Sequence, residues 1–209
     1  FDAEWQTVYN KNSVYDGQFT DIGGKKQTVT MMHYEEGQFI SDGKAKGFIK
    51  PYKSAKYSFA ALLPNEGIDL YDYIGSLSPE TLKNTLSNPE YVEVVATTPK
   101  FSYEYELTMN GVLGELGMTD AFSFDKADFT RLGRSSWGNI YVGEVLHKTF
   151  ISVDEKGTKA GAVTKVEMRD ECAMWPRETV TLNRPFVYMI IDNETNLPIF
   201  MGVVTEITQ

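Results

Sequence analysis

Residues 158–169 alternate between two kinds of side chain, and this pattern constrains the fold more than any other feature of the sequence. The odd positions are mostly charged, whereas the even positions are small or apolar: Thr158, Ala160, Ala162, Thr164, Val166 and Met168. This alternation suits a strand with one buried face, because successive side chains point to opposite sides of a sheet. The first half is rich in Ala and Gly, which hold a strand weakly. The pattern therefore predicts an edge strand or a flexible loop, and it also suits a segment that changes conformation.

Composition limits the class of protein. The 209 residues are enough for one large or two small domains, and 42% hydrophobic with 13% aromatic residues indicates a soluble folded chain. The net charge of −9 argues against a nucleic-acid partner, and no apolar run approaches the roughly 18 residues of a membrane span. The single cysteine, Cys172, excludes an intrachain disulfide and a Cys-rich metal site. We expect no metal or other cofactor.

Hydrophobic periodicity and turn residues predict a mixed α+β chain. Pro79 behind the capping Ser78 predicts a helix start, and apolar residues at helical spacing over 109–116, stopped by Gly117, predict another helix. Short connections favour antiparallel pairing. Strands are predicted at 19–29 (a hairpin around Gly23-Gly24), 57–63, 91–101, 140–153, 179–182, 186–191 and 199–207.

No group of residues indicates an enzyme. His33 and His147 are far apart in sequence and lack metal-ligand spacing, and Cys172 has no flanking motif of a catalytic thiol. The carboxylate pairs Glu35-Glu36 and Asp170-Glu171 are interpreted as solvated surface charge. Three glycines fall within a helical pattern and do not form a phosphate-binding loop: Gly111, Gly114 and Gly117.

Several separate motifs resemble those of the serpins, which trap serine and sometimes cysteine proteases. Residues 147–162 resemble the serpin hinge, and 183–191 with 198–202 resemble the signature that follows the reactive loop. Trp5 matches the family tryptophan at the top of the main sheet. Further matches follow in the family's order: Met31-Met32-His33, Pro99-Lys100-Phe101 and 116–122.

The resemblance covers the whole chain but only the carboxyl-terminal half, or slightly more, of a serpin. It implies a partial serpin fold of class α+β, with mostly antiparallel sheets, a few helices and an exposed reactive loop. Residues 1–209 are expected to be the carboxyl-terminal portion of a single serpin domain, beginning within a central strand of the large sheet, without the preceding helices and strands. The reactive loop is expected at 155–175. The family also implies a monomer at full length and an extracellular location.

In the family a protease cleaves the reactive loop and is held as an acyl-enzyme while the loop inserts into the large sheet. The resemblance implies a pivot at 155–157, where Gly157 is expected to adopt backbone angles closed to other residues. Trp5 and His147 are expected to be structural, and the inserted face is the even-numbered set from Thr158 to Met168. The hinge comprises Glu155, Lys156, Gly157, Thr158, Lys159, Ala160, Gly161 and Ala162.

The family's usual loop length, counted from Glu155, predicts a scissile bond between Glu171 and Cys172, which implies a Glu-preferring protease. The segment that follows is long for the family, so cleavage after Met174 is an alternative. Cleavage after Met174, Cys172 or Ala173 would suit elastase-like or chymotrypsin-like enzymes, and cleavage after Arg169 a trypsin-like one. The sequence gives no basis for ranking these cleavage sites.

The expected function is inhibition of a serine protease, or of a cysteine protease, without enzymatic activity of its own and without nucleic-acid or membrane partners. The alternatives are a non-inhibitory serpin, such as a carrier, chaperone or storage protein, and an inactive serpin fragment. Non-inhibitory relatives often carry bulky, charged or proline residues in the hinge. The small uncharged even positions here favour inhibition.

Overall fold

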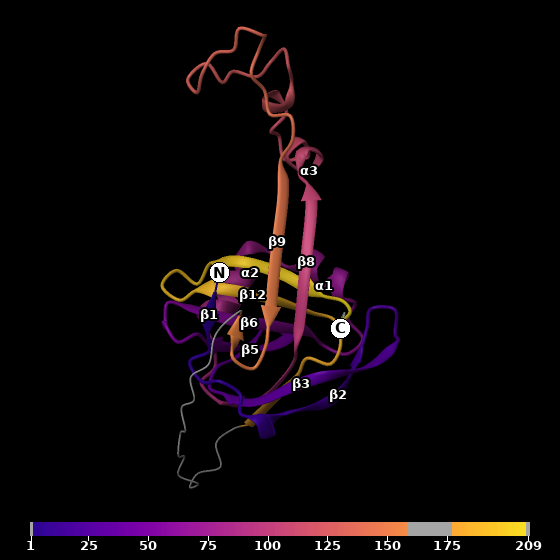
Figure 1. Cartoon of the computed structure of the whole chain (residues 1–209). Coiled ribbons are helices and arrows are strands. Elements are labelled where there is room, and N and C mark those ends of the chain that lie inside the picture. The colour runs from indigo at the N-terminus through magenta and orange to yellow at the C-terminus, as the bar shows by residue number, and fades with distance from the viewer. Residues whose placement is uncertain (1, 159–176, 208–209) are drawn as a thin grey trace. The chain divides into compact units, whose positions relative to one another are not determined.

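The computed structural model describes residues 2–158 and 177–207, and the chain divides into two compact units (Figure 1). Unit 1 comprises residues 1–102 and 152–209, and unit 2 comprises residues 103–151. Most of the predicted reactive loop, from Lys159 onward, lies outside the described residues.

A five-stranded antiparallel sheet forms the centre of unit 1. Its β12 carries the longest apolar run of the sequence, and all six residues from Phe186 to Ile191 are buried between the neighbouring strands β13 and β6. Such a run, without polar alternation, suits a strand covered on both faces. In spatial order the strands are β13 (Pro198–Val204), β12 (Phe186–Asp192), β6 (Tyr57–Pro64), β5 (Ala45–Pro51) and β4 (Phe39–Ser41).

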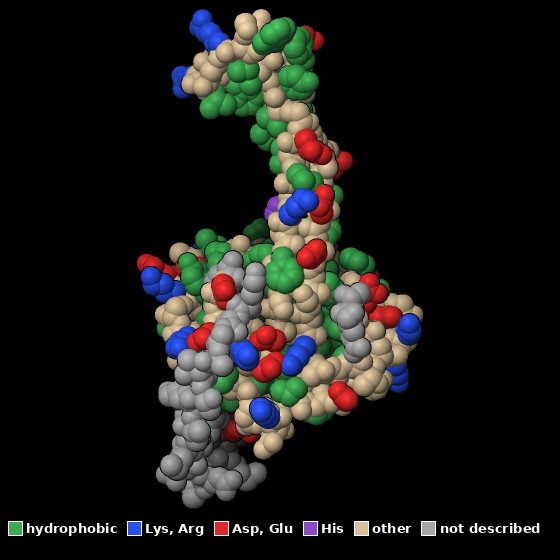
Figure 2. All heavy atoms as spheres, in the orientation of Figure 1, with side chains coloured by type: hydrophobic (Ala, Val, Ile, Leu, Met, Phe, Trp, Pro, Cys, Tyr) green, Lys and Arg blue, Asp and Glu red, His purple; other side chains and the backbone are tan. Residues whose placement is uncertain are grey.

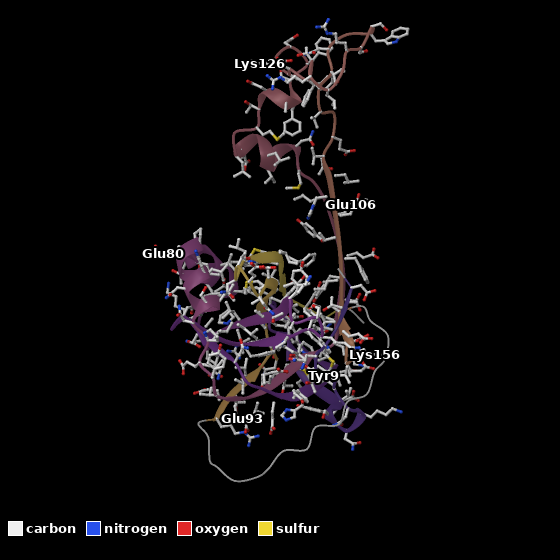
Figure 3. The ribbon with its side chains drawn as sticks, turned by 90° about the vertical axis from the view of Figure 1, so that its left-hand side faces the viewer. Tyr9, Glu80, Glu93, Glu106, Lys126 and Lys156 are labelled. Carbon is white, nitrogen blue, oxygen red and sulfur yellow. The ribbon has the colours of Figure 1, made fainter. Side chains whose placement is uncertain are left out.

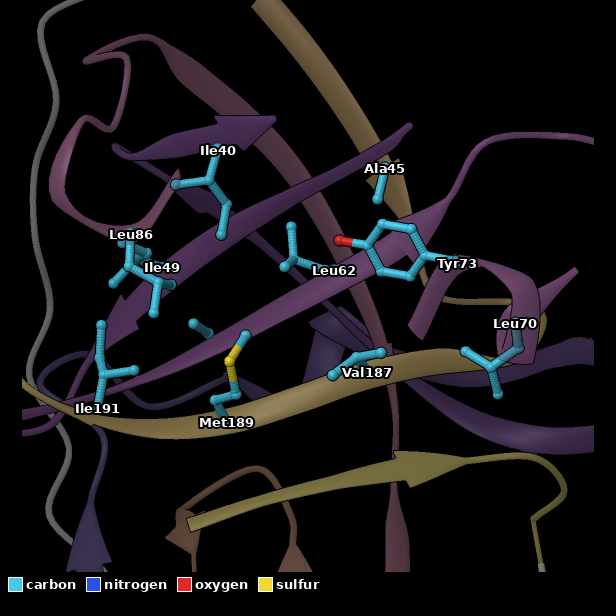
Figure 4. Packing of buried hydrophobic residues seen from close by; sticks show 11 residues of the cluster. Ile40, Ala45, Ile49, Leu62, Leu70, Tyr73, Leu86, Val187, Met189 and Ile191 are labelled. Carbon is cyan, nitrogen blue, oxygen red and sulfur yellow. The ribbon is translucent and has the colours of Figure 1, made fainter. Parts of the chain in front are cut away.

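Two short helices pack against this sheet. In α1 (Leu70–Ser76) the side chain of Asp69 accepts from the backbone of Tyr71 and Asp72, and α2 (Pro79–Ser87) begins with the predicted Ser78 cap. Figure 4 shows the resulting cluster, and complete burial of one such side chain contributes about 1.5–3 kcal/mol. Its members are Ile40, Ala45, Ile49, Ala60, Leu62, Leu70, Tyr73, Leu86, Val187, Met189 and Ile191.

A four-stranded sheet, also in unit 1, contains the predicted hairpin around Gly24, which has a φ of +83°. The pairing is mostly antiparallel, as predicted, but β11 runs parallel to β7 at one edge of this sheet. The chain leaves β7 at Pro99 and returns at Arg177 after forming β8 (Phe101–Thr108), β9 (Leu146–Val153) and β10 (Gly157–Thr158). A parallel neighbour requires such a long connection rather than a tight turn. The strand order is β11 (Arg177–Thr181), β7 (Glu93–Pro99), β3 (Lys26–Glu36) and β2 (Val14–Thr20), and the 3-10 helix η1 (Lys11–Ser13) precedes β2.

The third sheet has the order β1-β10-β9-β8. The short strand β10 (Gly157–Thr158) lies between β1 (Ala3–Glu4) and the end of β9 (Leu146–Val153), and it is antiparallel to both. Thr158 is opposite Ala3 on one side and Val153 on the other. The first residue of the alternating segment is therefore already a member of a sheet.

Unit 2 is built on the neighbouring strands β8 (Phe101–Thr108) and β9, linked by an ion pair of 2.6 Å between Lys148 and Glu106. It also contains α3 (Asn110–Glu115), which is shorter than predicted, and the 3-10 helix η2 (Asp120–Phe122). Residues 140–145, predicted as strand, are irregular; the Asn110 side chain binds the backbone of Gly143 and Val145. Figure 2 shows hydrophobic side chains gathered over the loop end of this unit.

Within the described ranges, no helix is long and apolar enough to cross a membrane. The same residues contain no group of three or more His, Cys, Asp or Glu side chains that could hold a metal ion. On the face of unit 1 seen in Figure 2, acidic and basic side chains are interspersed.

Candidate functional site

The candidate site is the turn that connects β9 to β10 together with β10 itself, and these contain the first four predicted hinge residues. The Asp154 side chain accepts hydrogen bonds from the backbone N–H groups of Lys156 (2.8 Å) and Gly157 (3.1 Å). The Asp154 N–H donates to the Gly157 carbonyl at 3.0 Å. Asp commonly closes a turn in this way because its short carboxylate reaches the backbone two residues ahead. Asp154 thereby brings the start of the alternating segment back alongside β9.

Backbone and side-chain donors from residues 5–9 hold the outer side of this turn. The Trp5 N–H donates to the Lys156 carbonyl and the Tyr9 N–H donates to the Glu155 carbonyl, both at 3.0 Å. The Trp5 indole Nε1 donates to the Asp154 carbonyl at 2.8 Å. Figure 3 shows Tyr9 and Lys156 close together. Three consecutive carbonyls of the turn, those of Asp154, Glu155 and Lys156, are thus bound by two residues of one neighbouring segment.

Thr158 faces the interior of unit 1 and is only 3% exposed. Its Oγ1 lies 2.7 Å from the Tyr52 hydroxyl, and the Tyr52 ring stacks on Trp5 with 4.7 Å between centroids. Burial raises the pKa of Tyr52, so its hydroxyl stays neutral and can donate or accept a hydrogen bond. The position accepts a small side chain with a hydroxyl and excludes a charge.

Gly157 is required for a different reason from the one expected. Its φ is not among the positive values found in this structure, so unusual backbone angles do not explain the glycine. Instead, a Cβ at this position would lie 2.2 Å from the Ala3 carbonyl oxygen and 2.8 Å from the Glu4 Cα. The close approach of β1 and β10 leaves no space for any side chain.

Glu155 forms an ion pair with Lys100, a residue of the predicted Pro99-Lys100-Phe101 motif. The hydrogen bond from Lys100 is the main reason that the pKa of Glu155 is lowered. Both side chains are about one-third exposed, at 33% and 35%, so solvent screens the pair. The pair connects the hinge to the segment between β7 and β8.

Glu155→Gln is expected to lower the free energy of unfolding slightly, by less than about 1 kcal/mol at pH 7. A lowered native-state pKa means that the contribution is complete above the ordinary Glu pKa of about 4.3 and is lost as the pH falls through the native-state value. Urea unfolding at pH 7 and pH 3 measures this, and the difference between wild type and variant should shrink at pH 3. A difference that grows on acidification would contradict the ion-pair interpretation. Glu106→Gln, which breaks an exposed pair in unit 2, is the matched control.

The other predicted site residues fall into two groups. His147 lies in β9 with its side chain exposed, and Trp5 is buried beside the hinge. The remaining positions lie outside the described residues: Lys159, Ala160, Gly161, Ala162, Thr164, Val166, Met168, Arg169, Glu171, Cys172 and Met174. Their predicted roles stay predictions.

Sequence reasoning missed Tyr52 and misjudged Glu36. Tyr52 meets Thr158 across 106 positions of sequence, so no local pattern could reveal the contact. The interpretation of Glu36 as solvated surface charge was wrong, because its carboxylate is buried and lies 2.6 Å from the buried ammonium of Lys50. Glu35 is more exposed and pairs with Arg177 at 2.9 Å.

Curated relatives match almost the whole chain. Mouse leukocyte elastase inhibitor A is 31% identical over 97% of this chain and 55% of its own length. Intracellular coagulation inhibitor 2 of Tachypleus tridentatus is 30% identical over 99% of this chain and 51% of its own length. The chain therefore spans about half the length of the curated relatives that it matches. The predicted extracellular location receives no support from these relatives.

Solved structures show the same fold. The native state of tengpin, a thermophilic serpin, is 52% identical and has a TM-score of 0.91, with 99% of this chain and 54% of tengpin covered. Human thyroxine-binding globulin complexed with its hormone is 25% identical and has a TM-score of 0.85, with 100% of this chain and 55% of that protein covered.

The family model described as "Serpin (serine protease inhibitor)" matches residues 1–207. That range includes the hinge turn, the strand beside it and both large sheets of unit 1. The sequence motifs, the fold and the matched relatives agree, and the chain belongs to the serpin family.

Proposed function

We propose that the protein contributes to a serine protease inhibitor that acts by loop cleavage, acyl-enzyme trapping and loop insertion. The observation that carries this proposal is the place of β10, between β1 and β9 and antiparallel to both. Thr158 starts the alternating segment and is already buried there. If residues after Thr158 extended β10, they would lengthen a strand that is already paired with β1 and β9.

In the proposed reaction the loop first behaves as a substrate. The catalytic serine oxygen of the protease attacks the carbonyl carbon of the residue before the scissile bond, and an ester forms as the amide bond breaks. The serine proton passes through the protease's base to the leaving amine, which becomes the new amino terminus of the downstream segment. The upstream segment, now joined to the protease, is released at one end and can enter the sheet.

Hydrogen bonding and side-chain size both favour insertion. About a dozen new ladder hydrogen bonds, at ~1 kcal/mol net each, would supply on the order of 10 kcal/mol. That is comparable to the whole stability of a typical domain and is enough to distort a bound protease. Serpin loop insertion is a known example of strand addition, and the even positions from Thr158 to Met168 would bury no charge.

We infer that the target protease cleaves between Glu171 and Cys172. The alternatives are cleavage after Arg169 and cleavage after Met174. The test uses a polypeptide that spans a whole serpin domain and includes this sequence. It is incubated with Glu-preferring, elastase-like, chymotrypsin-like and trypsin-like proteases, and complexes are detected on denaturing gels. Mass spectrometry of the released peptide identifies the cleaved bond.

The outcomes separate inhibition from the alternatives. A complex that survives SDS with at least one protease supports inhibition. Cleavage of the loop by every protease without any complex would favour a non-inhibitory serpin. Thyroxine-binding globulin, which shares the fold, is a ligand-binding relative. The same polypeptide titrated with thyroxine would then test the carrier alternative.

A further inference from the structure

Lys50 has an unusual position for a lysine. It lies on β5 with its side chain 2% exposed, and its Nζ is 2.6 Å from Glu36 Oε1 on β3. Three aromatic rings surround the ammonium: the Tyr9 and Tyr34 centroids are 4.5 Å from Nζ, and the Trp5 centroid is 5.4 Å away. A desolvated cation over aromatic faces is attracted more strongly than an exposed one. We call these five residues the Lys50 cage.

The Lys50 cage contains the two residues that bind the hinge. Trp5 and Tyr9 direct their rings at Lys50 while their N–H groups bind the carbonyls of Lys156 and Glu155. The neighbouring backbone is also paired, since Gln6 donates to Pro51 and Lys53 donates to Glu4. Lys50 and Glu36 lie on strands inside the two large sheets of unit 1, so they form a fixed base for segment 5–9.

We propose that Lys50 is a positioning residue that holds Trp5 and Tyr9 against the hinge and thereby restrains the opening between β1 and β9. The inference rests on the proposed function, because its consequence is control of when the loop enters the sheet. Further entry of the loop requires β1 and β9 to separate beyond the two residues of β10. Segment 5–9 must shift during that step, and the ammonium opposes the shift by binding its two rings.

The experiment replaces Lys50 and Glu36 together, as K50M/E36Q. The double variant removes both charges and keeps similar side-chain volumes, so no buried charge is left unpaired. The single variant K50M would leave Glu36 unpaired and could fail to fold, so it is not used. V187A is the matched control, because Val187 is buried in the sheet core far along the chain from the cage.

Hydrogen exchange of the intact chain is measured first, without any protease. The Trp5 and Tyr9 amides should exchange at least about tenfold faster in K50M/E36Q, while the amides of β12 stay unchanged. In V187A the amides of β12 should be affected instead. Equal acceleration at Trp5, Tyr9 and β12 in K50M/E36Q, or no acceleration at Trp5 and Tyr9, would overturn the proposal.

Spontaneous loop insertion is measured second, in the polypeptide that spans a whole serpin domain. During incubation without protease, K50M/E36Q should lose its capacity to form complexes about tenfold faster than wild type and V187A. A rate equal to or slower than that of V187A would overturn the proposed restraint. If wild type forms no complex with any protease, the proposed function fails, and hydrogen exchange still decides whether Lys50 anchors the hinge.

Discussion

In a polypeptide that spans a whole serpin domain and inhibits as proposed, Thr158→Arg is expected to turn the inhibitor into a substrate. Thr158 is buried, its hydroxyl lies 2.7 Å from that of Tyr52, and β1 and β9 flank it on both sides. An arginine there would place an unpaired charge in the sheet, at a cost of several kcal/mol. Insertion would slow, and hydrolysis of the acyl-enzyme would release the protease before it is distorted. A tenfold change in this partition corresponds to about 1.4 kcal/mol, so a large loss of complex is expected.

The measurement is the number of inhibitor molecules consumed per protease molecule trapped, which should rise at least about tenfold in Thr158→Arg. Thr158→Ser keeps the hydroxyl near Tyr52 and is the control, with a ratio close to that of wild type. If Thr158→Arg trapped protease as efficiently as Thr158→Ser, insertion through this position would be excluded. Because β10 is only two residues long, the uncleaved variant should remain folded with its hinge displaced from the sheet.

Gly157→Ala is expected to destabilise unit 1 by about 1–3 kcal/mol, as overpacked substitutions generally do. The new Cβ would lie 2.2 Å from the backbone oxygen of Ala3, and no side-chain rotation can relieve this contact, because the backbone fixes the position of Cβ. β1 and β10 would separate. The hydrogen bonds that Trp5 donates to the carbonyls of Asp154 and Lys156 would then be weakened as well.

Urea unfolding should show a lower midpoint for Gly157→Ala with an unchanged slope, which reports a stability change within a two-state transition. Gly37→Ala is the control, because a Cβ at Gly37 meets nothing within 4 Å and its φ is not among the positive values. Comparable midpoints for the two variants would refute the close-approach argument. Fluorescence of Trp5, which is buried beside the turn, should change in Gly157→Ala alone.

Local patterns in the sequence predicted several elements of the fold, whereas β4, β5 and β8 were not predicted. The Gly23-Gly24 turn, the Ser78 cap and the apolar run of β12 each depend on residues close together in the chain, and each is confirmed. The order of motifs predicted the serpin family, which the family match and the fold confirm. These features are accessible from sequence because turn chemistry and periodicity act over a few residues. The parallel pairing of β11 with β7 was not accessible, since its partners are distant in the chain.

The sequence by itself determined the alternation that begins at Thr158 and the membership of the chain in its family, and it predicted the hinge segment. Only the tertiary structure decided why these residues are needed. Position 157 requires glycine because the backbone of β1 lies too close for a Cβ, and not because of its own dihedral angles. Position 158 suits threonine because its hydroxyl lies within hydrogen-bond distance of Tyr52. Glu36, interpreted from sequence as a surface charge, is the buried partner of Lys50. In each case the deciding atom belongs to a residue that is not a neighbour in sequence. Packing brings such atoms together, and it leaves no local pattern in the sequence.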